Sequence, residues 1–168
     1  MMPAALLVNG FSRLPSLLDR ATAGLDARHL ATPPAEGANS IAWLVWHTAR
    51  GQDAWVSDLD GGAELWMAGG WRELFSLPFA PGENGFGMAY ADTLLVVAAP
   101  ELLTGYLAAV TARTVAYLGT LTAADLSVVV DDARRPVVTR GMQLMSILDD
   151  GLQHAGQAGY ARGILASA

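Results

Sequence analysis

The sequence predicts an all-α fold: a bundle of four helices with a long crossover loop between the second and third helices. Two observations support this prediction. Apolar residues recur at helical spacing over four long segments. A stretch rich in glycine, proline and aromatic residues separates the second segment from the third. With 168 residues the chain is long enough to bury a core, and we expect a single domain over residues 1–168.

The first predicted helix covers roughly residues 3–30. Gly10 and Pro15 interrupt it, so we expect a kink or a late start. The apolar positions that define the helix share one face, and they are Leu6, Leu7, Phe11, Leu14, Leu17, Leu18, Ala21 and Leu25.

The second predicted helix runs from about Ile41 to Leu59. Asn39 or Ser40 is a natural N-cap, and the sequence DGG ends the helix. The crossover follows over residues 61–91, where ELW and WRELF are expected to form short turns. We expect the crossover to be ordered and to pack over the end of the bundle, because its large aromatic side chains carry too much apolar area to remain in water. These are Trp66, Trp71, Phe75, Phe79 and Phe86.

The third predicted helix covers about residues 90–118, with Pro100 either kinking it or opening its main part. The sequences LSVVV and PVV follow as short strands or extended linkers. The last helix begins near Thr139 and runs almost to the end of the chain. Gly151, Gly156 and Gly159 lie in it. Because glycine is unfavourable in a helix interior, these three predict close approach of neighbouring helices or space beside a ligand.

Composition excludes several classes of chemistry. The chain has no cysteine, so it offers no thiolate nucleophile, disulfide or cysteine-based metal site. All ten basic residues are arginine, and the missing lysine excludes a Schiff base and a P-loop. The net charge of −6 argues against a nucleic-acid partner. The longest apolar run, which starts at Leu94, is too short to span a membrane, and no secretory signal is visible. We therefore expect a soluble, cytoplasmic protein.

Three polar residues of the predicted helices suggest a metal site. His47 lies in an apolar run of the second helix, where a hydrogen-bonded core histidine is the simpler interpretation. Asp150 and His154 are four residues apart on the last helix, so both side chains can reach one ion. An exposed Asp–His pair is the alternative, but the same stripe is otherwise apolar or small. An interior Asp150 would need a metal cation, a protonated histidine or an arginine beside it, and a divalent ion accepts two imidazoles and a carboxylate.

Two other charged residues are less informative. His29 stands at a polar helix end before a proline turn, and we expect it to be a solvated surface residue. Arg50 has three interpretations: it binds an anionic ligand, pairs with Asp53 or Asp150, or is a surface charge.

Two long segments resemble the DinB-like superfamily. They are NSIAWLVWHTARGQDAWVSDLDG in the second helix and DDGLQHAGQAGYARG in the last. The resemblance extends over nearly the whole chain, and WLVWHTAR and HAGQAGYARG are its most specific parts. More narrowly, the chain resembles an actinobacterial branch of uncharacterised DinB-like proteins, whose relatives include mycothiol-dependent maleylpyruvate isomerase and bacillithiol transferases.

The resemblance implies an up-down-down-up four-helix bundle with a divalent metal held by three histidines. The second-helix ligand corresponds to His47, and the H-x-x-x-H pair of the last helix corresponds to Asp150 and His154. Aspartate therefore replaces the usual histidine at one position. Zn²⁺, Ni²⁺, Mn²⁺ or Fe²⁺ would suit such a site. Substrate contacts are expected from Arg50, Gln157 and Trp43, and Gln157 is also a candidate hydrogen-bond partner of a metal ligand.

Three functions are compatible with these residues. The resemblance implies a metal-dependent transferase or isomerase that uses a low-molecular-weight thiol such as mycothiol. The alternatives are a non-catalytic protein that binds a metal or small ligand, and a structural protein with a degenerate site. The resemblance also implies a homodimer, with which the mean hydropathy of +0.32 is compatible.

Overall fold

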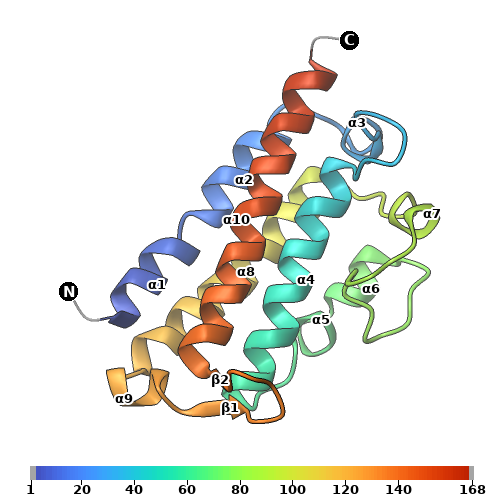
Figure 1. Ribbon diagram of the computed structural model, residues 1–168. Helices are drawn as coiled ribbons and strands as arrows, with labels where there is room; N and C mark the ends of the chain where they lie inside the picture. Colours follow the sequence, from blue (N-terminus) through green and yellow to red (C-terminus); the bar gives the residue numbers. More distant parts are fainter. Residues whose placement is uncertain (1–2, 167–168) are drawn as a thin grey trace.

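The structure is a computed structural model that describes residues 3–166 (Figure 1). Four long helical arms form a bundle, and the first arm is divided into α1 and α2. Followed along the sequence colours of Figure 1, the arms run up, down, down and up. Among the described residues, no helix has both the length and the apolar character needed to cross a membrane. The elements are α1 (Pro3–Phe11), α2 (Leu14–Thr22), α3 (Ala27–Ala31), α4 (Ile41–Asp60), α5 (Leu65–Ala68), α6 (Trp71–Phe75), α7 (Tyr90–Thr93), α8 (Pro100–Thr120), α9 (Ala123–Leu126), β1 (Val129–Asp131), β2 (Val138–Thr139) and α10 (Arg140–Leu165).

The first predicted helix is in fact three helices. Pro15 lies in the first turn of α2, where a backbone N–H would have no partner within the helix. Pro15 therefore begins a new helix and does not kink a continuous one. Gly24 has a φ of +74°, and Asp26 then caps α3 by accepting a hydrogen bond from the N–H of His29. The prediction of one helix over residues 3–30 was wrong because apolar spacing continues across both breaks.

The second predicted helix is confirmed as α4. The Ser40 hydroxyl accepts a hydrogen bond from the N–H of Trp43 at 3.2 Å, which makes Ser40 the N-cap. The helix ends at Asp60, and Gly61 follows in the left-handed conformation that terminates many helices. Both boundaries therefore have the local cause that the sequence indicates.

The third and fourth predicted helices differ in how well they were located. Residues 90–118 are not one helix: α7 is short, residues 94–99 are irregular, and Pro100 opens α8 at its first turn. The last helix is confirmed as α10, with Thr139 capping it by accepting a hydrogen bond from Met142 N–H. The valine-rich stretch before it forms the antiparallel pair of β1 and β2, as the sequence suggested.

The core lies between α4 and the other three arms. One group of buried residues surrounds Trp46, and a second surrounds Phe11 and Leu118. Gly151 lies against Leu14, and a Cβ there would be 3.0 Å from the leucine Cδ1, so this glycine permits close packing of α10 on α2. Gly156 and Gly159 have no such neighbour within 4 Å, and the prediction of close packing was wrong for them.

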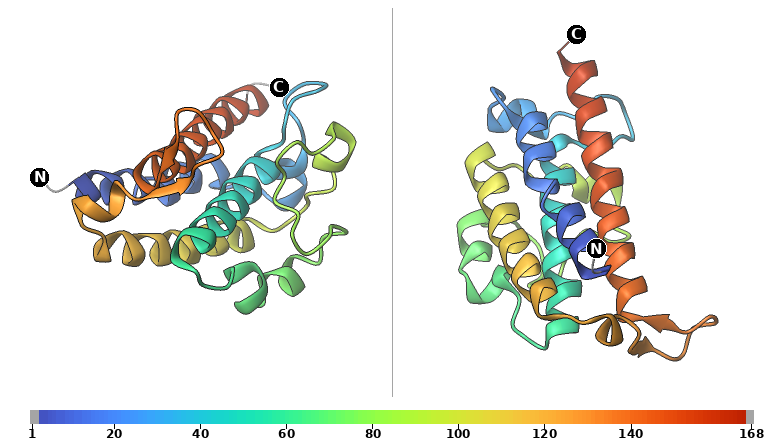
Figure 2. Two further views of the ribbon diagram at one scale, coloured as in Figure 1. Left: turned by 60° about the horizontal axis from the view of Figure 1, so that its bottom comes forward. Right: turned by 90° about the vertical axis from the view of Figure 1, so that its left-hand side faces the viewer.

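The crossover lies along the flank of α4 and α8, not over the end of the bundle as expected (Figures 1 and 2). It contains α5, α6 and α7, and its short turns at ELW and WRELF are confirmed. Trp66 and Phe75 are buried, whereas the side chain of Phe86 is 84% exposed. The crossover is therefore held by some of its aromatic residues and presents another to solvent.

Candidate metal centre

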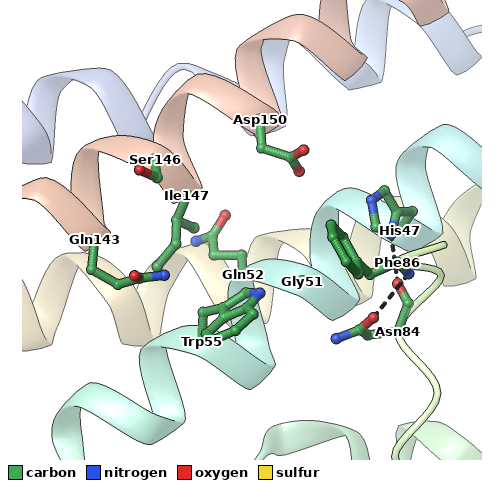
Figure 3. Close-up of a pocket in the computed structure, with 10 residues that line it drawn as sticks. All are labelled: His47, Gly51, Gln52, Trp55, Asn84, Phe86, Gln143, Ser146, Ile147 and Asp150. Carbon is green, nitrogen blue, oxygen red and sulfur yellow. Dashed lines mark hydrogen bonds between the residues drawn. The ribbon is translucent and has the colours of Figure 1, made fainter. Parts of the chain in front are cut away.

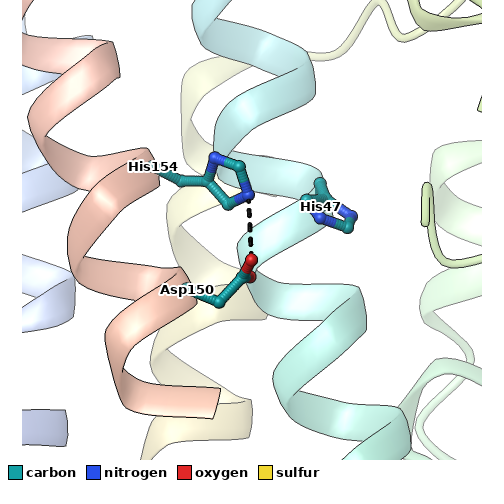
Figure 4. A group of neighbouring side chains, drawn as sticks. All are labelled: His47, Asp150 and His154. Atoms are coloured by element: carbon teal, nitrogen blue, oxygen red, sulfur yellow. Dashed lines mark ion pairs between the residues drawn. The ribbon is translucent and has the colours of Figure 1, made fainter. Parts of the chain in front are cut away.

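The structure brings His47, Asp150 and His154 together between two adjacent helices (Figure 4). His47 comes from α4, and the other two lie one turn apart on α10. Each offers one candidate ligand atom, and these atoms all lie within 4.8 Å of one another. Nε2 of His154 is 3.3 Å from Oδ1 of Asp150. The predicted convergence is therefore present, although the side chain of Asp150 is 53% exposed and not interior as expected. The cluster lies at the rim of the bundle.

Hydrogen bonds direct the same nitrogen of both imidazoles toward the cluster. Nδ1 of His47 is 2.5 Å from the backbone carbonyl oxygen of Asn84. A carbonyl can only accept, so Nδ1 must carry the proton and donate it, which leaves Nε2 with a free lone pair. Nδ1 of His154 is 3.0 Å from Oε1 of Gln157 and donates to it, while Nε2 lies 3.3 Å from Oδ1 of Asp150. Such partners are the ones that fix histidine ligands of metals.

A tight loop of the crossover holds the His47 ring. The carboxylate of Glu83 accepts hydrogen bonds from the N–H groups of Asn84 and Gly85, at 2.9 and 2.7 Å. Gly85 has a φ of +92°, and a Cβ there would lie 2.6 Å from Nδ1 of His47. Only glycine lets the loop backbone come this close to the ring. Glu83, Asn84 and Gly85 were not among the predicted site residues, because they lie in a stretch with no periodic pattern.

Arg50 anchors this loop to α4. Its side chain is fully buried, and its Nε donates to the backbone oxygen of Glu83 at 3.2 Å. Its Nη1 is 2.8 Å from Oε2 of Glu64 and 3.7 Å from Oδ2 of Asp53. The guanidinium also lies 4.9 Å from the centre of the Trp66 ring, within cation–π range. Of the three interpretations of Arg50, pairing with Asp53 is the one observed, and Glu64 is a partner that the sequence did not indicate.

Asp53 fixes the other end of the crossover. Its carboxylate accepts hydrogen bonds from the N–H groups of Leu65 and Trp66, at 3.0 and 2.7 Å. The hydroxyl of Tyr106 donates to the same carboxylate at 2.8 Å. Burial raises the pKa of that hydroxyl, so Tyr106 stays protonated. A buried carboxylate with several donors and a nearby guanidinium is a stable anchor.

The cluster also shifts the pKa values of its own members. Burial lowers the pKa of His47 and outweighs the hydrogen bond to Asn84. Burial opposes the charged ring of His154 as well, but the hydrogen bonds to Asp150 and Gln157 outweigh it and raise the pKa. Burial alone would raise the pKa of Asp150, yet the hydrogen bond and charge of His154 more than offset it and lower the pKa. Asp150 is thus an anion beside a neutral His47.

The remaining predicted site residues surround the imidazoles. Trp43 is only 6% exposed, and its ring stacks on that of His47 with 4.6 Å between centres. Its indole N–H is directed to the sulfur of Met88 at 3.4 Å. Gln157 accepts a hydrogen bond from Nδ1 of His154, as expected for a residue that orients a ligand side chain. His29 is on the surface as expected, bonded to Asp26 and remote in the chain from the ligand positions.

An open pocket adjoins the cluster in the groove between α4 and α10 (Figure 3). It has a volume of about 170 Å³, and His47 and Asp150 stand at one end. Trp55, Phe86 and Ile147 supply apolar wall. Polar side chains complete the lining, namely Gln52, Asn84, Gln143 and Ser146. The groove can therefore receive a small molecule beside the three candidate ligands.

The three side chains fit a divalent metal ion. Two imidazole nitrogens and a carboxylate oxygen suit Zn²⁺ and neighbouring first-row metals and leave coordination positions open. An ion bound at about 2.1 Å accommodates ligand atoms up to roughly 4 Å apart, so small side-chain rotations would close the present 4.8 Å span. Within residues 3–166 this is the one group of three or more potential ligands found at such spacing.

Comparisons with known proteins agree with this fold. The chain is similar to a solved structure titled "Crystal structure of the conserved protein of locus from Enterococcus faecalis", with 32% sequence identity and a TM-score of 0.94. The similarity covers 100% of this chain and 99% of that one. A search of curated proteins finds no match. The family model of the DinB superfamily matches residues 11–158. The chain therefore belongs to the DinB superfamily.

Proposed function

We propose that this protein is a metal-dependent enzyme that uses a low-molecular-weight thiol, with mycothiol as a candidate, in an S-transferase or isomerase reaction. One observation supports it most: two imidazoles and a carboxylate converge at the end of an open pocket. His47, Asp150 and His154 would hold Zn²⁺, Ni²⁺, Mn²⁺ or Fe²⁺. When bound, the ion would lower the pKa of a thiol that coordinates it.

The chain's own residues would orient the ligand and shape the reaction site. Asn84 and Gln157 keep Nε2 of each imidazole directed at the cluster. Trp43 covers the rings and excludes water from that side. Trp55 and Phe86 give an apolar surface for the electrophilic substrate. Since the chain has no cysteine, the thiol must come from a second substrate.

In the transferase form of the reaction, the thiol releases its proton to water and its sulfur attacks an electrophilic carbon. An S–C bond forms, and the bond to the leaving group breaks with both electrons going to that group. 1-Chloro-2,4-dinitrobenzene is a suitable test electrophile, because chloride leaves and the product absorbs light.

Metal content is the first test. Protein purified without a histidine tag should contain close to one divalent ion per chain by elemental analysis. His154→Gln should lose most of it, whereas His29→Gln, the same change at an exposed histidine, should keep it. Equal metal content in both variants, or none in the wild type after incubation with Zn²⁺ or Ni²⁺, would contradict the proposal.

Thiol use is the second test. Co²⁺-loaded protein should develop a sulfur-to-cobalt absorption band when N-acetylcysteine or mycothiol is added, and should accelerate conjugation of that thiol to 1-chloro-2,4-dinitrobenzene. A protein that binds metal but neither binds nor conjugates thiols would instead be a metal-binding or structural member of the superfamily.

A further inference from the structure

Gln52 of α4 has a buried hydrogen-bond acceptor that no described residue satisfies. The residue is 2% exposed, and its Oε1 lies within the protein without a hydrogen-bond donor. Gln52 also forms part of the wall of the pocket beside the candidate metal ligands. In Figure 3 its amide oxygen points toward α10, in the direction of Asp150. A buried acceptor without a donor is costly, so this oxygen is expected to meet a donor when the pocket is filled.

The orientation of the Gln52 amide is fixed by its neighbours. The hydroxyl of Thr114 donates its single proton to the backbone oxygen of Val110 at 2.9 Å. That hydroxyl can therefore only accept from Gln52, whose nitrogen Nε2 lies 2.8 Å away. The nitrogen must face Thr114, so the oxygen must face the other way. Rotating the amide would place two acceptors against each other, so the oxygen cannot be exchanged for a donor.

A second acceptor in the pocket wall points to the same ligand chemistry. The hydroxyl of Ser146 donates to the backbone oxygen of Met142 at 3.0 Å, so only its lone pairs remain for a ligand. Gln52 lies five residues beyond His47 on α4, which is about 7.5 Å along the helix axis. A ligand that reaches both places therefore carries its donor a few bonds from the atom that coordinates the metal.

We propose that Gln52 determines substrate specificity by accepting a hydrogen bond from an amide N–H or hydroxyl group of the ligand, a few bonds from its thiol. The inference rests on the proposed function, because it deepens the description of the thiol substrate. Ligands with an acceptor at that position would face the unpaired oxygen of Gln52 and bind more weakly. The pocket thus selects a donor-bearing thiol over an isosteric thiol that lacks the donor.

Two nearly isosteric probes test this directly. N-(2-mercaptoethyl)acetamide has an N–H where 2-mercaptoethyl acetate has an ester oxygen. Each is titrated into ¹⁵N-labelled protein, with and without Zn²⁺, and the dissociation constant is read from the indole N–H signal of Trp55, which lines the pocket. The amide should bind about tenfold more tightly than the ester, with or without metal.

Variants then assign the preference to Gln52. Gln52→Met keeps the side-chain length but removes the acceptor, and the ratio of the two dissociation constants should fall to about one. Gln153→Met makes the same change on the exposed face of α10 and should keep the wild-type ratio. Equal affinities in the wild type, or an unchanged ratio in Gln52→Met, would overturn the inference.

The same titration separates this inference from the proposed function. If Zn²⁺ does not bind, or does not strengthen the binding of either thiol, the metal-dependent function is wrong. The preference for the amide probe in metal-free protein would still support the role of Gln52.

Discussion

Replacing Gly85 by alanine should weaken metal binding without touching a ligand. The new Cβ would lie 2.6 Å from Nδ1 of His47, a distance that real Cβ contacts do not reach. The loop would have to move away from the ring, and the hydrogen bond from His47 to the Asn84 carbonyl would be lost. Loss of such a partner of a metal ligand typically reduces affinity by about 10–100-fold.

Stability should also fall, for two reasons that can be separated. The positive φ of Gly85 costs an alanine about 1–2 kcal/mol. Loss of the hydrogen bond adds about 0.5–1.5 kcal/mol. Together they predict that the free energy of unfolding of Gly85→Ala decreases by roughly 1.5–3.5 kcal/mol.

Gly87→Ala is the matched control. Gly87 has a φ of +70° in the same loop, but a Cβ there would have no neighbour within 4 Å. This variant should therefore lose stability through the backbone alone and keep wild-type metal affinity.

The two variants are compared by urea unfolding of metal-free protein and by competition with a chromophoric zinc chelator. If Gly85→Ala and Gly87→Ala bind Zn²⁺ equally well, then the Glu83–Gly85 loop does not position His47 for metal binding.

Three further predictions concern other parts of the molecule. Asp150→His should preserve or strengthen metal binding, because histidine is also a metal ligand, whereas Asp150→Ala removes a ligand and should weaken binding. Metal content measures both variants, and equal content in the two would show that Asp150 is not a ligand. Arg50→Met removes one of the two guanidinium groups near buried Asp53, and Nη1 of Arg113 remains 3.5 Å from that carboxylate. We therefore expect a loss of about 3 kcal/mol in the free energy of unfolding in urea titrations, the lower end for a broken buried pair. The exposed Arg20→Met should have little effect, and similar losses in both variants would argue against the buried anchor. Hydrogen bonds from Thr122 lower the pKa of Asp125 below its ordinary value of 3.8. The ionised carboxylate therefore stabilises the fold above pH 3.8, and this stabilisation is lost as the pH falls through the lower pKa of the folded state. Asp125→Asn should be less stable than the wild type at neutral pH and equally stable in strong acid, and a difference that persists in acid would contradict this.

The sequence predicted the elements whose ends have a local cause. Ser40 and Gly61 mark the ends of α4, and Thr139 marks the start of α10, because capping residues act within a few positions of the helix end. The prediction of one helix for the first arm was wrong, because apolar residues continue on one face across the breaks near Arg13 and Gly24. Hydrophobic periodicity reports which face is buried and not whether the backbone is continuous.

The candidate site was predictable only in part. The spacing of Asp150 and His154 placed them on one turn, whereas their pairing with His47 required the family resemblance, since nothing in the local sequence connects positions so far apart. Asn84 acts through its backbone oxygen, which every residue has, so its side chain gives no signal. Gln52 looked like an ordinary helical residue until its orientation and burial were known.

The crossover is fastened to α4 at two places one turn apart, by Asp53 near its beginning and by Arg50 near its later part. Between these fastenings, Ala80, Pro81 and Gly82 are exposed. Added residues there would lengthen a surface loop, and doubling a loop's length costs only about 0.6 kcal/mol. Insertions at residues 80–82 should therefore be tolerated, while an insertion between Glu83 and Gly85 would displace the carbonyl that holds His47. The crossover can therefore change its length at residues 80–82 while the loop that holds His47 and the candidate metal ligands keep their positions.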